Sequence, residues 1–451
     1  MLELIDRWFR PNLEEFLSTR QPLVWALALA SGIAAAIGAV LFRIAIGLVQ
    51  WPWLGTLSEN VAAAASLQPW WVIFLAPVAG GLVVGLILQH LLPGNRPYSV
   101  PEVIRARLEG SERLDLRSGV GSAVTSAISL GSGASAGREG PVVHLGASIA
   151  AALCRRFDLS RGAARILFAC GVASAVSASF NAPIAGVLFA QEVILNRFRG
   201  TTFVPLVIAS TSGAVLSRLW FGDYAAFVVP EHQITSYLEF PAFVLLGLVC
   251  ALVSVMFQST LLIADRVARD LPMPLWLRPV TGGLAIGAMG VFLPQVLGVG
   301  YDTTDAALKE NLPLVLLLLL IPAKTLATGI TLASRFGGGV FSPSLYVGAM
   351  TGGAFGMIAA MAFPELSSSN GLYAILGMGA VAGAVLGAPI STAVMVFELT
   401  GGYALTIALL LTVAISNGLS LAVLGRSFFE AQLATRGSAQ PDRQKDLWSY
   451  D

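Results

Sequence analysis

The residues best suited to chemistry lie in one stretch, GSGASAGREGPVVHLG from Gly131 to Gly146, where Arg138 and Glu139 follow a glycine- and serine-rich loop. An ionisable group within apolar sequence is costly and is by default a functional candidate. Pro141 suits the first turn of a helix, where its missing N–H costs nothing. The free amides and dipole of such a helix end attract anions. The stretch therefore predicts an anion site at a helix N-terminus.

A hydrolase is the remote alternative for the same stretch. Residues 133–137 fit the pattern G-x-S-x-G, which exposes a nucleophilic serine in hydrolases when a strand precedes it. No strand is expected here, and the chain has only three histidines, His90, His144 and His232. We interpret His144 as a packed helix residue rather than a proton relay. No HExxH, Walker A or metal-ligand pattern occurs, so we expect no cofactor and no metal.

The composition predicts that the elements around this stretch are membrane helices. Of 451 residues, 56% are hydrophobic and 12% charged, against about 25% charged in soluble domains. The apolar segments are residues 22–50, 70–93, 118–133, 141–154, 164–180, 183–198, 201–221, 238–265, 276–297, 312–333, 343–363, 371–387 and 389–424. Several of them are shorter than the roughly 20 residues of a straight span. We therefore expect an all-α polytopic membrane protein with broken, tilted helices around a site at depth.

Charge patterning gives the expected domain organisation and topology. A net charge of +1 gives no reason to expect a nucleic-acid partner. The basic clusters at 104–117 and in the C-terminal tail place both termini in the cytoplasm by the positive-inside rule. We expect an amphipathic surface helix over 1–20, a first membrane repeat over 21–221, a second over 222–433, and a short polar tail over 434–451 with no appended soluble domain.

An internal repeat supports two related halves. GVASAVSASFNAPIAGVLFAQE, from Gly171 to Glu192, matches GMGAVAGAVLGAPISTAVMVFE, from Gly377 to Glu398, at constant separation. Upstream, REGPVVHLGA resembles VFSPSLYVGA. Repeated halves with broken helices usually place the substrate between them.

These motifs resemble the CLC family of chloride channels and anion/proton antiporters. The resemblance rests on GREGP at 137–141, GVFSP at 339–343 and the duplicated NAPI and GAPI blocks, and it covers most of the chain. It implies an inverted repeat of broken helices, a homodimer in the lipid bilayer with one pathway for a small inorganic anion in each subunit, and four helix N-termini meeting around the ion. It also implies a transport protein rather than an enzyme, in a bacterial inner membrane.

Carried over by position, the resemblance makes Glu139 the gating glutamate, which occupies an anion site and swings aside. Like charges compete for one positive pocket, so the gate and the anion exclude each other. The alternative for Glu139 is an ordinary carboxylate at a helix start. The remaining anion-binding candidates at the two helix starts, mostly through backbone amides, are Gly140, Pro141, Val142, Val340, Phe341 and Ser342, with Arg138 more an anchor of the loop than a ligand.

Two side-chain donors of the family pattern are altered. The family motif GSGIPE reads here PYSVPE at 97–102, so Tyr98 replaces the serine that faces the anion, unless Ser99 serves in a shifted register. Near the C-terminus, Phe429 replaces a tyrosine and has no hydroxyl. We expect Tyr98 to supply the hydroxyl lost at Phe429; the alternative is that backbone amides alone bind the ion. These changes alter pocket volume and donor directions, so chloride, bicarbonate, nitrate and fluoride remain open as substrates.

A third departure concerns protons. Coupled exchangers of the family usually carry a glutamate after the FxxE block, and here that position is Val193. Glu192 and its repeat mate Glu398 we interpret as structural. The sequence therefore favours passive, proton-uncoupled anion permeation, with anion/proton exchange as the alternative.

Two further basic residues lie near the predicted pathway. Arg335, just before GVFSP, either raises the positive potential at a pore mouth or pairs with a carboxylate, and we favour the pair. Lys324, within an apolar run, is expected near a vestibule or snorkelling to an interface.

Overall fold

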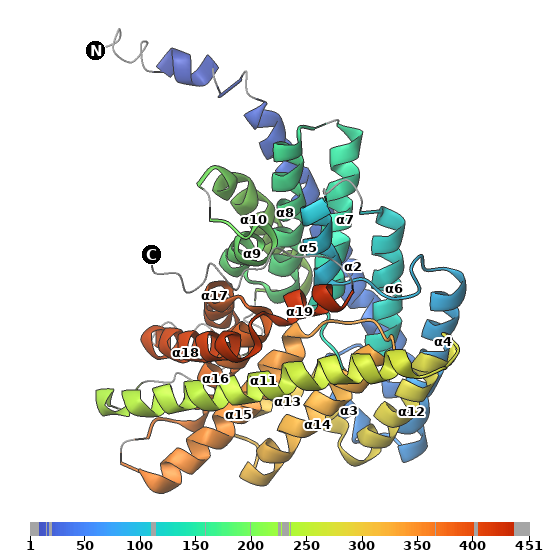
Figure 1. Cartoon of the computed structure of the whole chain (residues 1–451), viewed down its shortest axis with the longest axis vertical. Helices are drawn as coiled ribbons and strands as arrows, with labels where there is room; N and C mark the ends of the chain where they lie inside the picture. Colours follow the sequence, from blue (N-terminus) through green and yellow to red (C-terminus); the bar gives the residue numbers. More distant parts are fainter. Residues whose placement is uncertain are drawn as a thin grey trace.

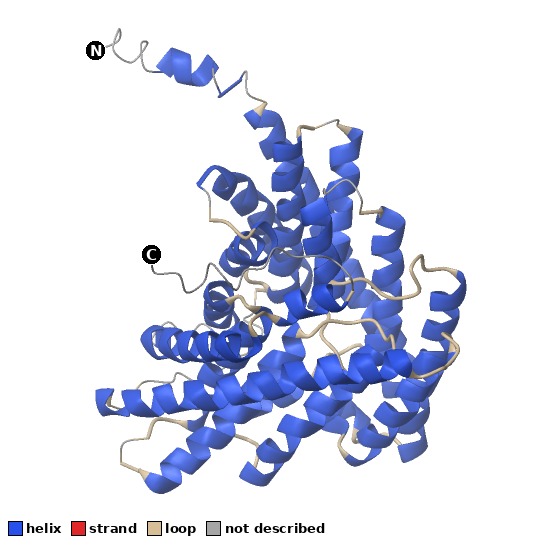
Figure 2. Cartoon of the chain, in the orientation of Figure 1, coloured by secondary structure: helices blue, strands red, loops and turns tan. Residues whose placement is uncertain are grey.

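The computed structural model describes residues 9–14, 16–17, 20–109, 114–157, 159–198, 200–223, 227, 234, 236–365, 367–400 and 405–436. Over these residues the regular structure is helical (Figure 2). Eight helices are long and apolar enough to cross a membrane. The prediction of an all-α polytopic membrane protein is confirmed.

The first half contains ten helical elements among the described residues between 21 and 221. They are α2 (Gln21–Leu54), α3 (Val61–Ala65), α4 (Trp70–His90), α5 (Val100–Glu109), α6 (Leu116–Gly131), α7 (Glu139–Arg156), α8 (Arg161–Phe180), α9 (Pro183–Phe189) continued by the π-helical segment η2 (Ala190–Leu195), and α10 (Gly200–Phe221). The predicted helix over 1–20 lies only partly within the described residues, where 9–14 and 16–17 are helical.

The second half follows the same order. It contains η3 (Tyr237–Glu239), α11 (Phe240–Asp270), α12 (Leu277–Phe292), η4 (Pro294–Val296), α13 (Tyr301–Leu308), α14 (Leu314–Ala333), α15 (Phe341–Ala362), α16 (Asn370–Leu386), α17 (Pro389–Thr400), α18 (Thr406–Leu424) and α19 (Phe428–Thr435). The single segment expected over 389–424 is wrong, because α17 and α18 are separate helices. The sequence between them carries two adjacent glycines, which disfavour helix. Most of the predicted tail, residues 437–451, lies outside the described residues.

The repeat is visible in matching helix contacts. Helices α7 and α8 pack closely through Gly146 and Gly171, where a Cβ on Gly146 would lie 2.4 Å from the Gly171 carbonyl oxygen. Helices α15 and α16 pack in the same way through Gly348 and Gly377, where the corresponding distance is 2.3 Å. Small residues at such contacts let membrane helices approach closely. Both halves therefore use the same helix pair to support the loop that precedes it.

Two glutamates join the halves reciprocally. Glu398 at the end of α17 accepts hydrogen bonds from the amides of Ile184 and Ala185 at the start of α9, at 3.0 and 2.7 Å. Glu192 in η2 accepts hydrogen bonds from the first amides of α17, at 3.1 and 2.7 Å. Such mutual contacts are those of a self-complementary two-fold interface. The structural interpretation of Glu192 and Glu398 is confirmed.

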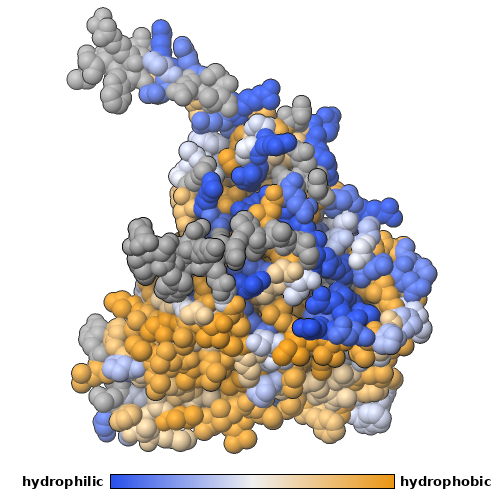
Figure 3. Space-filling model, in the orientation of Figure 1, coloured by the Kyte–Doolittle hydropathy of each residue, from blue (hydrophilic) through white to orange (hydrophobic). Residues whose placement is uncertain are grey.

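The helices cross one another at many inclinations rather than forming a parallel bundle (Figure 1). Helix α4 of the first half packs on α12 of the second, and α9 packs on α17. Figure 3 shows hydrophobic surface over the lower part of this view, with hydrophilic residues gathered above it. The interior where the halves meet holds the loops that precede α7 and α15.

Candidate functional site

The loops before α7 and α15 pair directly with each other. Gly137 and Gly339 exchange backbone hydrogen bonds of 2.7 Å in both directions, as an isolated antiparallel bridge. A Cβ on Gly140 would lie 2.1 Å from the Ser99 hydroxyl and 3.2 Å from the Cα of Gly339. Only glycine fits such an approach. The pairing brings the N-terminal ends of α7 and α15 together between the two halves.

Glu139 is the first residue of α7 and is only 3% exposed. One carboxylate oxygen, Oε1, accepts a hydrogen bond of 2.9 Å from the Tyr301 hydroxyl and a short one from the Ser342 hydroxyl. The other oxygen, Oε2, has no hydrogen-bond partner among the described residues. Glu139 is therefore a buried carboxylate at a helix N-terminus, and one of its oxygens is unused. The hydroxyls that hold its other oxygen are donors that a competing anion can also use.

Tyr301 is the site residue that the sequence reasoning missed. It is the first residue of α13 and follows Gly300, whose φ of 87° is left-handed and favours glycine. Nothing in its own segment, GVGYDTTDAALKENLP, marks it as a site residue. No local pattern reveals that Tyr301 reaches a glutamate 162 positions away.

Arg138 is anchored on the side of the site lined by Tyr301. It forms an ion pair with Glu59 and donates a hydrogen bond of 2.9 Å to the Ser179 carbonyl. Arg43 binds the same Glu59 carboxylate at 2.7 Å. Burial opposes ionisation of Glu59, but the two guanidinium groups outweigh it and hold its pKa below the usual value. These contacts are those of an anchor, and direct contact of Arg138 with an anion stays a prediction.

An outer cavity opens onto this cluster. Its volume is about 490 Å³, and its lining includes Arg138 and Tyr301 together with Arg43, Glu59 and Lys309. Charges of both signs therefore line the approach to Glu139 from this side. We call this cavity the Tyr301 mouth.

The opposite side is narrower and more basic. A cavity of about 50 Å³ is lined by the end of the α5 loop, the loop before α15 and the start of α19, with Ser99, Gly339, Val340, Phe428 and Phe429 among its residues. Four helix starts therefore converge here, those of α5, α7, α15 and α19, as the resemblance implied. Helix dipoles so arranged favour a small anion without any charged ligand. We call this cavity the Phe429 mouth.

Ser99, not Tyr98, lies at the Phe429 mouth. The Tyr98 hydroxyl donates a hydrogen bond of 2.8 Å to the Pro93 carbonyl, and its ring packs on His144 with centroids 5.4 Å apart. The expectation that Tyr98 replaces the hydroxyl missing at Phe429 does not fit this geometry. The backbone of PYSVPE turns the serine inward because the first α5 residues are fixed by Glu102, which accepts a hydrogen bond of 2.9 Å from the Ser99 amide.

Val193 lines a third cavity, of about 240 Å³, with Glu192 and Glu430. Both carboxylates already accept backbone hydrogen bonds, Glu192 from the start of α17 and Glu430 from Ser427 in the capping box of α19. Neither is a free replacement for a carboxylate at position 193. The inference that position 193 lacks a proton relay, and that anion flux is therefore not coupled to protons, stays a prediction.

The two remaining basic candidates have different surroundings. Lys324 is fully buried and donates hydrogen bonds to the carbonyls of Val296 and Gly298, at 3.0 and 2.8 Å. It therefore braces the loop that leads to Tyr301, near the vestibule rather than snorkelling. Within the part of the chain that the structure describes, Arg335 makes no ion pair, so the favoured pairing with a carboxylate is wrong.

Ser135 offers no support for hydrolase chemistry. It is fully buried, and its hydroxyl has no hydrogen-bond partner among the described residues, whereas a nucleophile needs a base within reach. Its amide donates a hydrogen bond of 3.1 Å to the Thr331 hydroxyl. Ser135 thus helps to hold the loop before α7.

Comparisons with known proteins show the family of the chain. Residues 80–421 match the family model described as voltage gated chloride channel. A ClcB-like chloride channel protein of Ralstonia nicotianae is 31% identical over 390 residues, covering 86% of this chain and 91% of that protein. Chloride channel protein CLC-f of Arabidopsis thaliana is 30% identical. The match covers 88% of this chain and 54% of that protein, so this chain spans about half of its length.

Solved structures show the same fold. The crystal structure of a slow cyanobacterial Cl⁻/H⁺ antiporter matches with a TM-score of 0.82 at 22% identity, covering 92% of this chain and 97% of that one. The crystal structure of a CLC-type fluoride/proton antiporter matches with a TM-score of 0.75 at 23% identity, covering 92% and 98%. At these identities the likeness concerns the fold alone.

Proposed function

This chain belongs to the voltage gated chloride channel (CLC) family, and we propose that it lets a small monovalent anion pass the membrane passively, without coupled protons, under the control of Glu139. The family consists of channels and transporters, and the chain is an integral multi-pass membrane protein. The observation that carries the proposal is the position of Glu139 where the starts of α7 and α15 meet, with hydroxyl donors on one carboxylate oxygen only. A carboxylate there occupies the place that an anion would take.

The proposed anion path runs from the Tyr301 mouth, past Glu139, to the Phe429 mouth. Its ligands are the hydroxyls of Ser342 and Ser99 and the amides at the starts of α7 and α15, whereas the Tyr301 hydroxyl serves to hold Glu139. When Glu139 moves away or is protonated, these donors turn to the anion, so the pocket exchanges one negative charge for another. Phe429 contributes an apolar wall, which favours an anion that sheds water easily.

Absence of coupling is proposed from Val193, because the side chain at the relay position cannot carry a proton. The alternative, anion/proton exchange, is favoured by one observation. Buried His144 has two ring nitrogens with no hydrogen-bond partner among the described residues, and it contacts Tyr98.

Anion efflux from liposomes that hold the purified protein tests both versions. Chloride, bicarbonate, nitrate and fluoride are compared while internal pH is followed. Flux that moves no protons uphill supports passive permeation. Proton movement driven by an anion gradient would establish exchange and refute the inference from Val193.

Glu139→Gln tests the gate in the same assay. We expect flux that no longer depends on pH, because the variant has no titratable carboxylate where the starts of α7 and α15 meet. Glu398→Gln is a matched control, since it neutralises a carboxylate that holds α9 instead. Unchanged flux and pH dependence in Glu139→Gln would contradict the gate assignment.

We further propose that two copies form a homodimer with separate pathways, in a bacterial inner membrane with cytoplasmic termini. Ile184 and Ile390, at matching positions of α9 and α17, are 56% and 47% exposed and give this face an apolar surface. Cysteine cross-linking at these positions in membranes tests the dimer, and accessibility of a C-terminal tag tests the orientation.

A further inference from the structure

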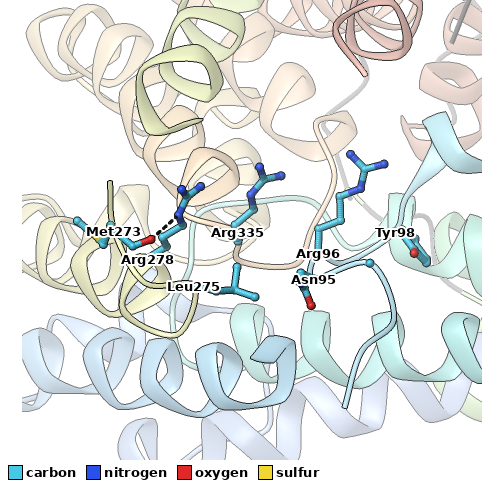
Figure 4. A pocket seen from close by; sticks show the side chains of 8 residues that line it. Asn95, Arg96, Tyr98, Met273, Leu275, Arg278 and Arg335 are labelled. Atoms are coloured by element: carbon cyan, nitrogen blue, oxygen red, sulfur yellow. Dashed lines mark hydrogen bonds between the residues drawn. The ribbon is translucent and has the colours of Figure 1, made fainter. Parts of the chain in front are cut away.

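Next to the Phe429 mouth lies a larger basic pocket that the proposed anion path does not use. Its volume is about 400 Å³, and it is lined by Gly94, Asn95, Arg96, Tyr98, Met273, Leu275, Arg278 and Arg335. Three guanidinium groups from three separate elements face it, and no carboxylate lines it. Figure 4 shows the guanidinium ends of Arg96, Arg278 and Arg335 extending to the same side.

Carboxylates offset part of this charge. Arg96 forms an ion pair of 3.5 Å with Glu102, which also pairs with Arg436. Asp265, which acts electrostatically on Arg335, forms an ion pair of 3.1 Å with Arg269. Within the described residues neither Arg278 nor Arg335 forms an ion pair, so two of the three guanidinium groups keep an unpaired positive charge.

The guanidinium groups keep donors for a ligand. Among the described residues, the Arg278 guanidinium donates to two backbone carbonyls, that of Met273 at 3.4 Å (Figure 4) and that of Leu271 at 3.3 Å. Within the described ranges the guanidinium group of Arg335 makes no hydrogen bond or ion pair. Its φ of 69° is left-handed, a conformation that favours glycine or asparagine, so a non-glycine residue is held there at a cost. The planar guanidinium groups of Arg278 and Arg335 therefore keep N–H groups whose geometry matches that of phosphate oxygens.

The size of the pocket argues against chloride as the intended occupant. A single water takes about 30 Å³ of liquid volume, so the pocket holds far more than a monatomic anion. Small-molecule sites typically measure about 300–1,000 Å³. An anion with several oxygens, able to reach three guanidinium groups at once, makes full use of this space.

We propose that Arg96, Arg278 and Arg335 form a binding site for a multiply charged phosphate group, carried either by a soluble polyphosphate or by the headgroup of an anionic lipid. Arg96 and Arg335 also line the Phe429 mouth. A bound phosphate group there places negative charge beside the entry to the anion path. Occupancy therefore inhibits anion flux. The binding itself is independent of the proposed function, and only its effect on flux rests on it.

Binding is tested on the full chain in phosphatidylcholine nanodiscs, with tripolyphosphate as the soluble probe and isothermal calorimetry as the readout. The lipid arm measures the thermal unfolding of the protein in phosphatidylcholine vesicles with and without phosphatidic acid. We expect the double variant Arg278→Gln/Arg335→Gln to weaken tripolyphosphate binding about tenfold or more, because it removes two charge-assisted contacts. Arg335→Lys keeps the charge but lacks the fork, and its affinity should be intermediate.

Arg165→Gln is the matched control, because Arg165 is exposed on α8 and does not line the pocket. It removes one positive charge outside the pocket and should leave binding unchanged. Unfolding of each ligand-free variant shows whether it is folded before binding is compared. Stabilisation by phosphatidic acid without tripolyphosphate binding, lost in the double variant, assigns the site to a lipid headgroup and supports the proposal.

Two outcomes would overturn it. One is that the folded wild-type protein binds tripolyphosphate no better than the double variant does, with no effect of phosphatidic acid. The other is inhibition or stabilisation that persists unchanged in the double variant. If binding occurs as expected but no anion flux is found, the phosphate site stands and the proposed permeation function fails.

Discussion

Replacing Tyr301 by phenylalanine isolates the contact that holds Glu139 in place. The change removes one hydroxyl that donates a hydrogen bond of 2.9 Å to the carboxylate, and it keeps the buried ring that packs on Phe227 and lies 5.0 Å from the Arg138 guanidinium carbon. Ser342 remains as the second donor to the same oxygen. The variant therefore removes one of the two hydrogen bonds that hold the Glu139 carboxylate and leaves the other in place.

The size of the effect follows from the charge of the acceptor. A hydrogen bond to an ionised group contributes about 1.5–3 kcal/mol, and a neutral one about 0.5–1.5 kcal/mol. A free-energy change of about 1.4 kcal/mol corresponds to a factor of ten. Loss of the hydroxyl therefore shifts the equilibrium between Glu139 in its hydrogen-bonded position and an anion bound in its place by about tenfold to a hundredfold, towards the anion. We expect half-maximal flux at a correspondingly lower anion concentration.

The assay is chloride efflux from liposomes over a range of chloride concentrations at fixed pH. Tyr373→Phe is the matched control, because its hydroxyl donates a hydrogen bond of 2.6 Å to a different buried carboxylate, that of Glu239. It should destabilise the protein to a similar degree and leave the chloride dependence unchanged.

A double-mutant cycle gives the refuting result. In Glu139→Gln the carboxylate that Tyr301 holds is absent, so Tyr301→Phe should add little to it. If Tyr301→Phe shifts the chloride dependence equally in the wild type and in Glu139→Gln, the hydroxyl acts directly on the anion or on the fold. The inference that it holds the Glu139 carboxylate would then be wrong.

Three further predictions concern the residues that support the site. Lys324→Met should lower the free energy of unfolding by about 1–3 kcal/mol, because two buried carbonyls lose their donor; thermal unfolding that matches the wild type would contradict this role. Arg138 and Arg43 hold the pKa of Glu59 below its usual value, so its stabilising effect is complete above the unfolded pKa of about 4.3 and is lost as pH falls towards the folded pKa. Glu59→Gln should therefore flatten the pH dependence of unfolding in that acidic range, and an identical acid profile would count against the ion pairs. Glu398→Gln should cost about 1 kcal/mol of stability, because a neutral amide caps the helix amides of α9 less well than a carboxylate; equal unfolding temperatures would show that the cap contributes nothing.

Much of the fold was predictable because the determinants are local in sequence. Long apolar runs define spanning helices in any arrangement, since lipid leaves the backbone no other partners. Pro141 and Pro343 mark the starts of α7 and α15, and both helices begin two residues before them. The repeated blocks also predicted that Glu192 and Glu398 have the same structural role. The break between α17 and α18 was missed because apolar residues continue on both sides of it.

The site was only partly predictable, because its members come from distant segments. Glu139, Ser342 and Ser99 were named from motifs, and the structure brings them together at the starts of α7, α15 and α5. Tyr301 was not, because nothing in its own segment marks it. The register of the PYSVPE motif left open whether Tyr98 or Ser99 supplies the hydroxyl. The structure places the Ser99 side chain at the Phe429 mouth and turns that of Tyr98 away from it. For Arg335, the expected carboxylate partner is absent from the described residues.

The sequence by itself therefore determined the class of protein, the family resemblance, the repeat and the carboxylate on which the proposed gate depends. These follow from composition and from residues close together in the chain. The tertiary structure alone decided which hydroxyls hold that carboxylate, which side chain of PYSVPE faces the anion path, and which arginines gather beside its mouth. Those contacts join residues up to hundreds of positions apart, and their geometry depends on how the two halves pack rather than on any local preference.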